Sequence, residues 1–196
     1  MEKTESAVRS RLLEAGKEEF RDKGFLKASL RAICKKADVT TGALYFFFES
    51  KAALFEKIVE ETVGNLEKMA ENLTDPQSGE LKMTEEYDRI FMEFIWENRD
   101  IARILMEGAE GTRYENFWED TCTKMERLLQ KNFQKKCGRE ADSDLVHILI
   151  GMKMQGYREL LKGNYSREKL LELSRMLKLC TDRSVEAVAE EINKKQ

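Results

Sequence analysis

Apolar residues recur every three or four positions along nearly the whole chain of 196 residues, which is the period of an amphipathic α-helix. Up to residue 73 this pattern predicts a helix of about 18 residues that ends near Gly24, two short helices, and a long helix capped by Ser50. After a loop at residues 74–79 it predicts helices at residues 83–97, 100–109, 113–136, 142–162 and 166–193. One proline and 11 glycines are too few for the many turns of a β-protein. The sequence therefore predicts an all-α fold.

The two short helices, within residues 29–51, have the spacing of a helix-turn-helix. Ser29 is placed to cap the first helix, Asp38 falls at the turn, and Thr40 is placed to cap the second helix. The second helix begins with three small residues, Thr41, Gly42 and Ala43. Small side chains let the start of a helix approach another surface closely, as a recognition helix does in the DNA major groove.

This N-terminal part, from Leu12 to Val59, resembles the TetR family of bacterial transcriptional regulators. The residues that carry the resemblance are Ala15, Phe20, Gly24, Phe25, Ser29, Ile33, Ala37, Val39, Gly42, Leu44, Tyr45, Phe48, Lys51, Leu54 and Phe55. The resemblance implies a three-helix DNA-binding domain at residues 1–50. It also implies a helical effector-binding and dimerisation domain at residues 51–196.

The resemblance implies roles for individual residues in DNA binding. Arg31 corresponds to a position that often reads a base, and Arg paired with guanine is the commonest specific contact. Thr41 has a hydroxyl for base edges, while Gly42 and Ala43 let the backbone approach. Ser29, Thr40, Tyr45 and Lys51 are expected to contact phosphates. Simple helix capping is the alternative for Ser29 and Thr40, and both roles are compatible.

Five positions depart from the family pattern, among them Cys34 in place of a common small Ala. Phe46 and Phe47 occupy positions where the family usually has Tyr or His, and Phe has no donor for a phosphate. An apolar contact with a thymine methyl group remains open to them. Asp38 replaces the usual turn glycine, and Glu49 adds a negative charge beside the expected phosphate path. These changes predict weaker DNA binding or an unusual sequence preference.

Charge is distributed unevenly along the chain, whose formal net charge is −3. Residues 1–51 contain 11 Lys and Arg against 8 Asp and Glu, whereas residues 52–196 contain 23 against 29. The first quarter of the chain is therefore the part suited to face a polyanion.

Several classes of protein are disfavoured by what the sequence lacks. The cysteines, Cys34, Cys122, Cys137 and Cys180, form no C-x-x-C pair, and there is one histidine, so a zinc finger is excluded. We expect the cysteines to be small buried hydrophobes, with redox sensing as the alternative.

No catalytic residues, metal or cofactor are expected, which leaves little support for a helical enzyme. Without a signal-peptide pattern or a membrane-length apolar segment, a cytoplasmic protein is expected.

The C-terminal two-thirds is rich in methionine and aromatic residues. We expect a ligand pocket lined by Phe91, Met92, Trp96, Met106, Phe117, Trp118, Met125 and Met152. The alternative is that these side chains form ordinary core packing.

A homodimer is expected through the last two helices. The expected contact residues are Gly151, Gly156, Leu173 and Leu177. The leading hypothesis is a homodimeric repressor that a small, largely hydrophobic effector releases from a double-stranded DNA operator. The alternative is a ligand-independent DNA-bound adaptor that recruits a protein partner.

Overall fold

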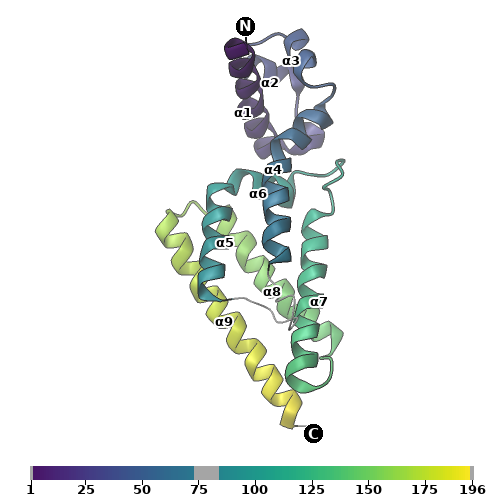
Figure 1. Cartoon of the computed structure of the whole chain (residues 1–196), viewed down its shortest axis with the longest axis vertical. Helices are drawn as coiled ribbons and strands as arrows, with labels where there is room; N and C mark the ends of the chain where they lie inside the picture. The colour runs from purple at the N-terminus through teal and green to yellow at the C-terminus, as the bar shows by residue number, and fades with distance from the viewer. Residues whose placement is uncertain (1, 73–83, 195–196) are drawn as a thin grey trace. The chain divides into compact units, whose positions relative to one another are not determined.

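The computed structural model describes residues 2–72 and 84–194, and all regular secondary structure in these ranges is α-helical. The helices are α1 (Glu2–Lys27), α2 (Leu30–Lys36), α3 (Thr41–Phe47), α4 (Lys51–Glu71), α5 (Glu85–Glu97), α6 (Arg99–Glu107), α7 (Phe117–Cys137), α8 (Ser143–Lys162) and α9 (Arg167–Lys194), as Figure 1 shows. The predicted all-α fold is confirmed, and most helix bounds agree within two residues. The predicted loop 74–79 lies outside the described residues.

The chain divides into two compact units. Unit 1 comprises residues 1–68 and 98–117, and unit 2 comprises residues 69–97 and 118–196. The first 50 residues are not a separate unit, because most of α4 and all of α6 complete the same core. The functional division at residue 50 stays a prediction.

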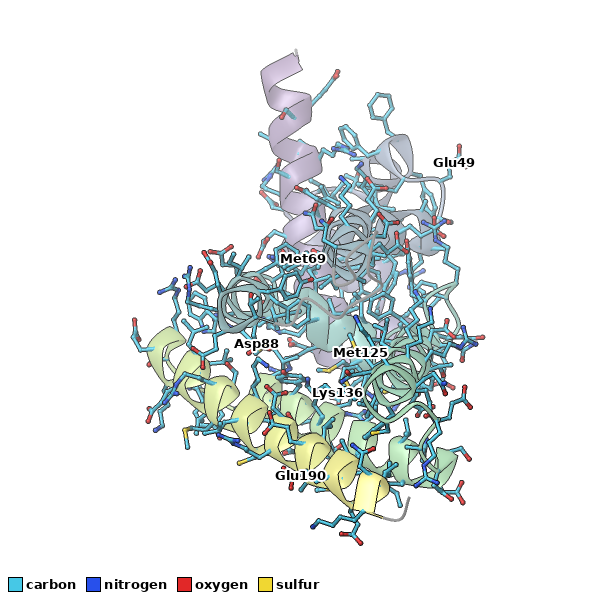
Figure 2. All side chains as sticks on the ribbon, turned by 60° about the horizontal axis from the view of Figure 1, so that its bottom comes forward. Glu49, Met69, Asp88, Met125, Lys136 and Glu190 are labelled. Carbon is cyan, nitrogen blue, oxygen red and sulfur yellow. The ribbon has the colours of Figure 1, made fainter. Side chains whose placement is uncertain are left out.

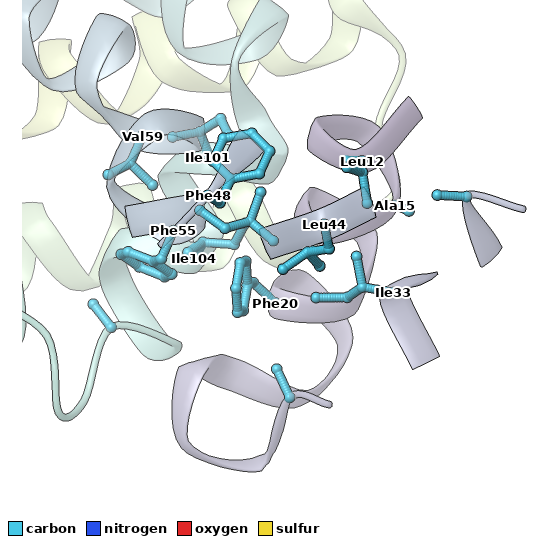
Figure 3. Close-up of a cluster of buried hydrophobic side chains, with 14 of the residues drawn as sticks. Leu12, Ala15, Phe20, Ile33, Leu44, Phe48, Phe55, Val59, Ile101 and Ile104 are labelled. Carbon is cyan, nitrogen blue, oxygen red and sulfur yellow. The ribbon is translucent and has the colours of Figure 1, made fainter. Parts of the chain in front are cut away.

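Unit 1 is built around aromatic rings from α1 and α4. Phe20 packs edge-on against Phe55 with ring centroids 5.1 Å apart, and Phe25 lies 5.4 Å from the same ring. Ile33 of α2 and Leu44 of α3 are fully buried in this core (Figure 3). Burial of each such side chain contributes about 1.5–3 kcal/mol. The core therefore fixes the two short helices against α1.

The C-terminal end of α6 is docked onto a break in α1. Gly24 has φ 70°, a left-handed conformation that interrupts α1 where the sequence predicted a helix end. Beyond the break, the Phe25 N–H donates to the Gly108 carbonyl at 2.7 Å. Near the start of α6, Asp100 pairs with Arg21 of α1 at 3.1 Å. Helix α6 is thereby bound to the helix that supports α2 and α3.

Unit 2 contains α5, α7, α8 and α9. One buried cluster joins α7, α8 and α9, and it includes Leu129, Phe133, Val146, Ile150 and Ala189. None of the described helices is both long enough and apolar enough to cross a membrane.

Candidate functional site

Side-chain caps fix both starting points of the helix-turn-helix. The Ser29 hydroxyl accepts from the Ala32 N–H at 3.4 Å, and the Thr40 hydroxyl accepts from the Ala43 N–H at 3.1 Å. Both predicted caps are confirmed. Asp38, between the two helices, has φ 51°, which is the left-handed conformation that the family's usual glycine would adopt more easily.

Helix α3 presents a continuous exposed face. Its exposed residues are Thr41, Gly42, Tyr45 and Phe46, whereas Leu44 and the following Phe48 are buried. Ala43 is half-buried beside the exposed face. Arg31 on α2 is also exposed, and its guanidinium has no ion pair or hydrogen bond to any residue that the structure describes. These positions are free to meet a ligand as large as a DNA duplex.

Phe46 and Phe47, the two aromatic residues that differ from the family pattern, have different environments. The Phe46 side chain is 73% exposed, the most of any large hydrophobic residue in the described ranges. Phe47 is half-buried against the core of unit 1, and its ring meets that of Phe46 edge-on with centroids 5.0 Å apart. Phe47 therefore supports Phe46, and its own contact with DNA stays a prediction.

Lys51 has a structural role that the sequence did not reveal. Its ammonium donates to three carbonyl oxygens, those of Phe25 at 2.7 Å, Leu26 at 3.2 Å and Ala28 at 3.2 Å. It also lies 4.6 Å from the centroid of the Phe25 ring. An ammonium has three N–H bonds, so none is left for the phosphate contact that we expected. Lys51 instead satisfies the carbonyl groups at the end of α1.

Glu19 is a second buried polar support that the sequence did not indicate. Its carboxylate accepts from the Ser29 N–H at 3.2 Å and from the Lys23 ammonium at 2.8 Å. Burial raises the pKa of Glu19, but Lys23, the Ser29 N–H and Lys36 lower it by more, so the net effect is a pKa below the ordinary value for Glu. The charged form of Glu19 therefore holds the start of α2.

Removal of this charge gives a prediction with a defined pH dependence. The folded pKa lies below the unfolded value, so Glu19 stabilises the fold above about pH 4.5 and loses this effect as the pH falls further. Glu19→Gln is expected to cost about 1–2 kcal/mol of unfolding free energy at pH 7. Urea titrations at several pH values should show the difference shrinking below pH 4.5. The matched Glu14→Gln, at an exposed pair with Lys17, is expected to cost less than about 0.5 kcal/mol. A Glu19→Gln cost that persists unchanged in acid would contradict the assignment.

Arg31 gives a second prediction, on base recognition. Arg31→Ala is expected to cost about 1–3 kcal/mol of binding free energy on the preferred sequence and to relax discrimination at one base pair. Competition binding with single-base variants of that sequence measures both effects. Equal losses on preferred and random DNA would show that Arg31 contacts only the backbone.

The charges around α3 are of both signs. Glu49 is exposed after α3 (Figure 2), where the sequence placed it beside the expected phosphate path. Lys35 is exposed on α2, whereas Lys36 pairs with Glu18 at 2.8 Å. The positive charge available to DNA is thus smaller than the composition suggests.

The residues predicted to line a ligand pocket are divided between the two units. Unit 1 contains Met106 and Phe117, both half-buried, and Phe117 packs against the core around Phe55. The other six belong to unit 2: Met92 is buried, Phe91, Trp96, Trp118 and Met125 are half-buried, and Met152 is exposed. Trp118 and Met125 pack against the core of α7, α8 and α9, which is the alternative that the sequence left open. Met152 is misplaced in the predicted set, because its side chain is 64% exposed.

A hollow of about 360 Å³ lies elsewhere in unit 2. Residues 139–142 before α8 and the last turns of α9 form it, with Leu145, Val188 and Ile192 in its wall. None of the eight predicted pocket residues lines it.

Unit 2 also contains a buried polar seam that apolar periodicity did not predict. Asp88 of α5 and Lys178 of α9 are 5% and 6% exposed, at positions where a helix normally buries an apolar side chain. Asp88, labelled in Figure 2, accepts from the Tyr157 hydroxyl at 3.3 Å, and Lys178 pairs with Asp182. Lys153, one turn before Tyr157, makes no hydrogen bond or ion pair within the described parts of the chain.

The electrostatics of this seam favour neutral forms. Burial raises the pKa of Asp88 and lowers the pKa of Lys153, although each charge partly offsets the other. A signal for the seam exists in the sequence: Asp88 stands four residues before the buried Met92, in register with the apolar stripe.

Helices α8 and α9 expose apolar side chains. These are Ile148 and Met152 on α8, and Met176 and Leu179 on α9. Cys180 is exposed on α9 as well, so the expectation of a buried residue is wrong for this cysteine, whereas Cys34 and Cys137 are buried.

The residues predicted at a dimer interface have mixed environments. Gly151 is exposed, and a Cβ atom added there would meet nothing within 4 Å. Leu173 is half-buried. A Cβ atom on Gly156 would lie 2.7 Å from Leu177, so this pair packs α8 against α9 of the same chain. A role of these four residues between subunits stays a prediction.

The capped helix pair, with its exposed small-residue start, has the geometry of a helix-turn-helix. Residues 12–58 match the family described as "Bacterial regulatory proteins, tetR family". The HTH-type transcriptional regulator UidR of Escherichia coli is 44% identical over 52 residues, and this alignment covers only 26% of each chain. The chain thus spans about a quarter of the length of this relative.

Longer similarities extend through unit 2. The HTH-type transcriptional regulator AcrR of Shigella flexneri is 28% identical over 172 residues, which cover 81% of this chain and 78% of AcrR. The crystal structure of a transcriptional regulator (TerR/AcrR family) from Aquifex aeolicus is 27% identical, with a TM-score of 0.60, and covers 88% of this chain and 99% of that one. The family match at residues 12–58 and these longer similarities together support a TetR family transcriptional regulator.

Proposed function

We propose that this protein is a cytoplasmic, homodimeric repressor that a small effector releases from its DNA operator. The exposed face of α3, formed by Thr41, Gly42, Tyr45 and Phe46, is the observation that carries the DNA-binding part. A dimer would place two such helices in successive major grooves, about 34–36 Å apart.

The exposed apolar side chains of α8 and α9 support the dimer. Ile148, Met152, Met176 and Leu179 lie on two helices that pack side by side in unit 2. Several large apolar side chains exposed together commonly mark an interface. We propose that a second copy of the chain covers this apolar face, because a helix-turn-helix protein needs two copies to bind the two half-sites of a palindromic operator.

The buried polar seam supports an effector that carries a polar group. Asp88 is buried with the Tyr157 hydroxyl as its hydrogen-bond partner, and the half-buried Lys153 has no hydrogen bond or ion pair among the described residues, so the charged form of each is disfavoured in the apo fold. A ligand group that accepts from Lys153 and donates to Asp88 would recover part of this cost. The largely hydrophobic character that we expected for the rest of the effector stays a prediction.

Coupling between effector and operator is proposed to run through α6. This helix is bonded to α1 by the Phe25–Gly108 hydrogen bond and the Arg21–Asp100 pair. Displacement of α6 would therefore tilt α1 and the two helices packed on it. A coupling of about 1–3 kcal/mol changes operator affinity roughly 5- to 150-fold.

The test combines operator selection with a charge placed on the apolar face. Purified protein is expected to enrich one palindromic sequence from a pool of random duplexes and to sediment as a dimer. Met152→Glu is expected to give a folded monomer with greatly reduced operator affinity, because a Glu buried between subunits lacks a partner. The control Thr123→Glu, at an exposed position of α7, should behave as wild type. A full dimer for Met152→Glu would place the interface elsewhere, and the lack of any enriched sequence would refute the proposal.

A further inference from the structure

Phe46 is an apolar side chain where a DNA-binding helix usually has a polar one. The ring is 73% exposed and lies on the face of α3 that also carries Thr41, Gly42 and Tyr45. It contributes nothing to the core, which takes Leu44 and Phe48 from the same segment. Its exposure therefore needs a reason outside the folding of unit 1.

The space beside the ring is open on the helix surface. Gly42 stands one turn before Phe46, and a Cβ atom added to Gly42 would meet only the Thr40 hydroxyl, at 3.8 Å. A flat groove edge can therefore lie against the backbone of Gly42 and the ring of Phe46 together. No described side chain of α3 covers this position.

The ring is also held in place. Phe47 meets it edge-on, with centroids 5.0 Å apart and an angle of 89° between the planes. Phe47 is itself packed against the core of unit 1. This contact limits the ring on one edge, so part of the conformational freedom that binding would remove is already lost.

The chemistry of the ring limits what it can recognise in DNA. Phe has no donor or acceptor, so it cannot hydrogen-bond a phosphate or a base edge. The apolar group on base edges in the major groove is the C5-methyl group of thymine. We propose that Phe46 reads a thymine methyl group and so sets one base of the operator. This inference rests on the proposed function, in which α3 enters the major groove.

The experiment removes the methyl group and nothing else. In the enriched operator each thymine is replaced in turn by deoxyuridine, and affinity is measured by fluorescence anisotropy at one salt concentration. For the wild type we expect about a three- to fivefold loss at one thymine in each half-site, the size that burial of a single methyl group gives. The other thymines should tolerate the exchange.

The variant Phe46→Ala tests whether this side chain makes the methyl contact. We expect it to bind the thymine operator no more tightly than the wild type binds the deoxyuridine operator. Replacing that thymine by deoxyuridine should leave the affinity of Phe46→Ala unchanged. Its melting temperature should match the wild type, because the ring is exposed. The matched variant Tyr45→Ala, next to it on the same face, should keep the wild-type sensitivity to deoxyuridine.

The outcomes separate this inference from the proposed function. If no deoxyuridine exchange changes the affinity of the wild type, the methyl contact is refuted, whereas the proposed operator binding is not. Sensitivity that survives in Phe46→Ala assigns the methyl contact to another residue and also overturns it. Operator bending without any deoxyuridine effect would point to Phe46 as a wedge between bases and overturn it too. If no sequence is enriched, the proposed function fails and this inference fails with it.

Discussion

Gly108→Val is expected to lower the free energy of unfolding by about 2–3 kcal/mol, because it inserts a side chain where two backbones touch. A Cβ atom at Gly108 would lie 3.2–3.3 Å from the Ile104 carbonyl, the Gly24 Cα atom and the Phe20 carbonyl. None of these is the flexible end of a side chain, so α6 must move away from α1. Chemical denaturation measures the loss.

The matched control is a glycine of the same unit with free space. A Cβ atom on Gly64, in α4, would meet nothing within 4 Å. Gly64→Ala is therefore expected to raise stability by about 0.5–1 kcal/mol. If Gly108→Val unfolds with the same free energy as the wild type, α6 does not pack tightly against α1. The proposal that α6 transmits effector binding to the DNA-binding helices would then be refuted.

Lys51→Met is expected to destabilise unit 1 by about 2–3 kcal/mol, since it leaves three carbonyl oxygens without their charged donor. Methionine keeps the apolar stem, so the loss reports the ammonium. Lys57→Met, on the same helix, removes only a partly exposed pair with Glu60 and should cost less than about 0.5 kcal/mol. Thermal and urea unfolding of both variants measure the difference.

The same variant separates the structural role of Lys51 from a phosphate contact. Measured on folded protein, Lys51→Met should leave the salt dependence of DNA binding unchanged. Loss of one phosphate contact would instead lower the slope of log affinity against log salt by about one unit. A lowered slope with unchanged stability would reverse the assignment.

The sequence was informative where a residue's role depends on its near neighbours. The caps Ser29 and Thr40, the break at Gly24 and the alternation of Leu44 and Phe48 with exposed residues all follow from spacing of a few positions. The helix bounds of the C-terminal part were predicted for the same reason, since a period of 3.6 residues is a local signal.

What the sequence did not show depends on partners far along the chain. Lys51 was read as a phosphate ligand, and its carbonyl partners lie 23 to 26 residues earlier. The Asp88–Tyr157 contact spans 69 residues, so the position of Asp88 in the apolar stripe could suggest burial, but no local pattern could identify its partner. Phe46 and Phe47 are adjacent and identical in type, and only the packing of the core separates their environments.

The composition of unit 1 has a consequence for how the protein is made. Its core needs α6, and Arg21 pairs with a residue 79 positions further along the chain. A ribosome adds about 5–20 residues per second, so the first helices wait several seconds before residues 98–117 emerge. During that interval the apolar side chains of α1 and α4 that pack against α6 in the folded unit lack this partner, so the unit cannot complete its core until α6 is made.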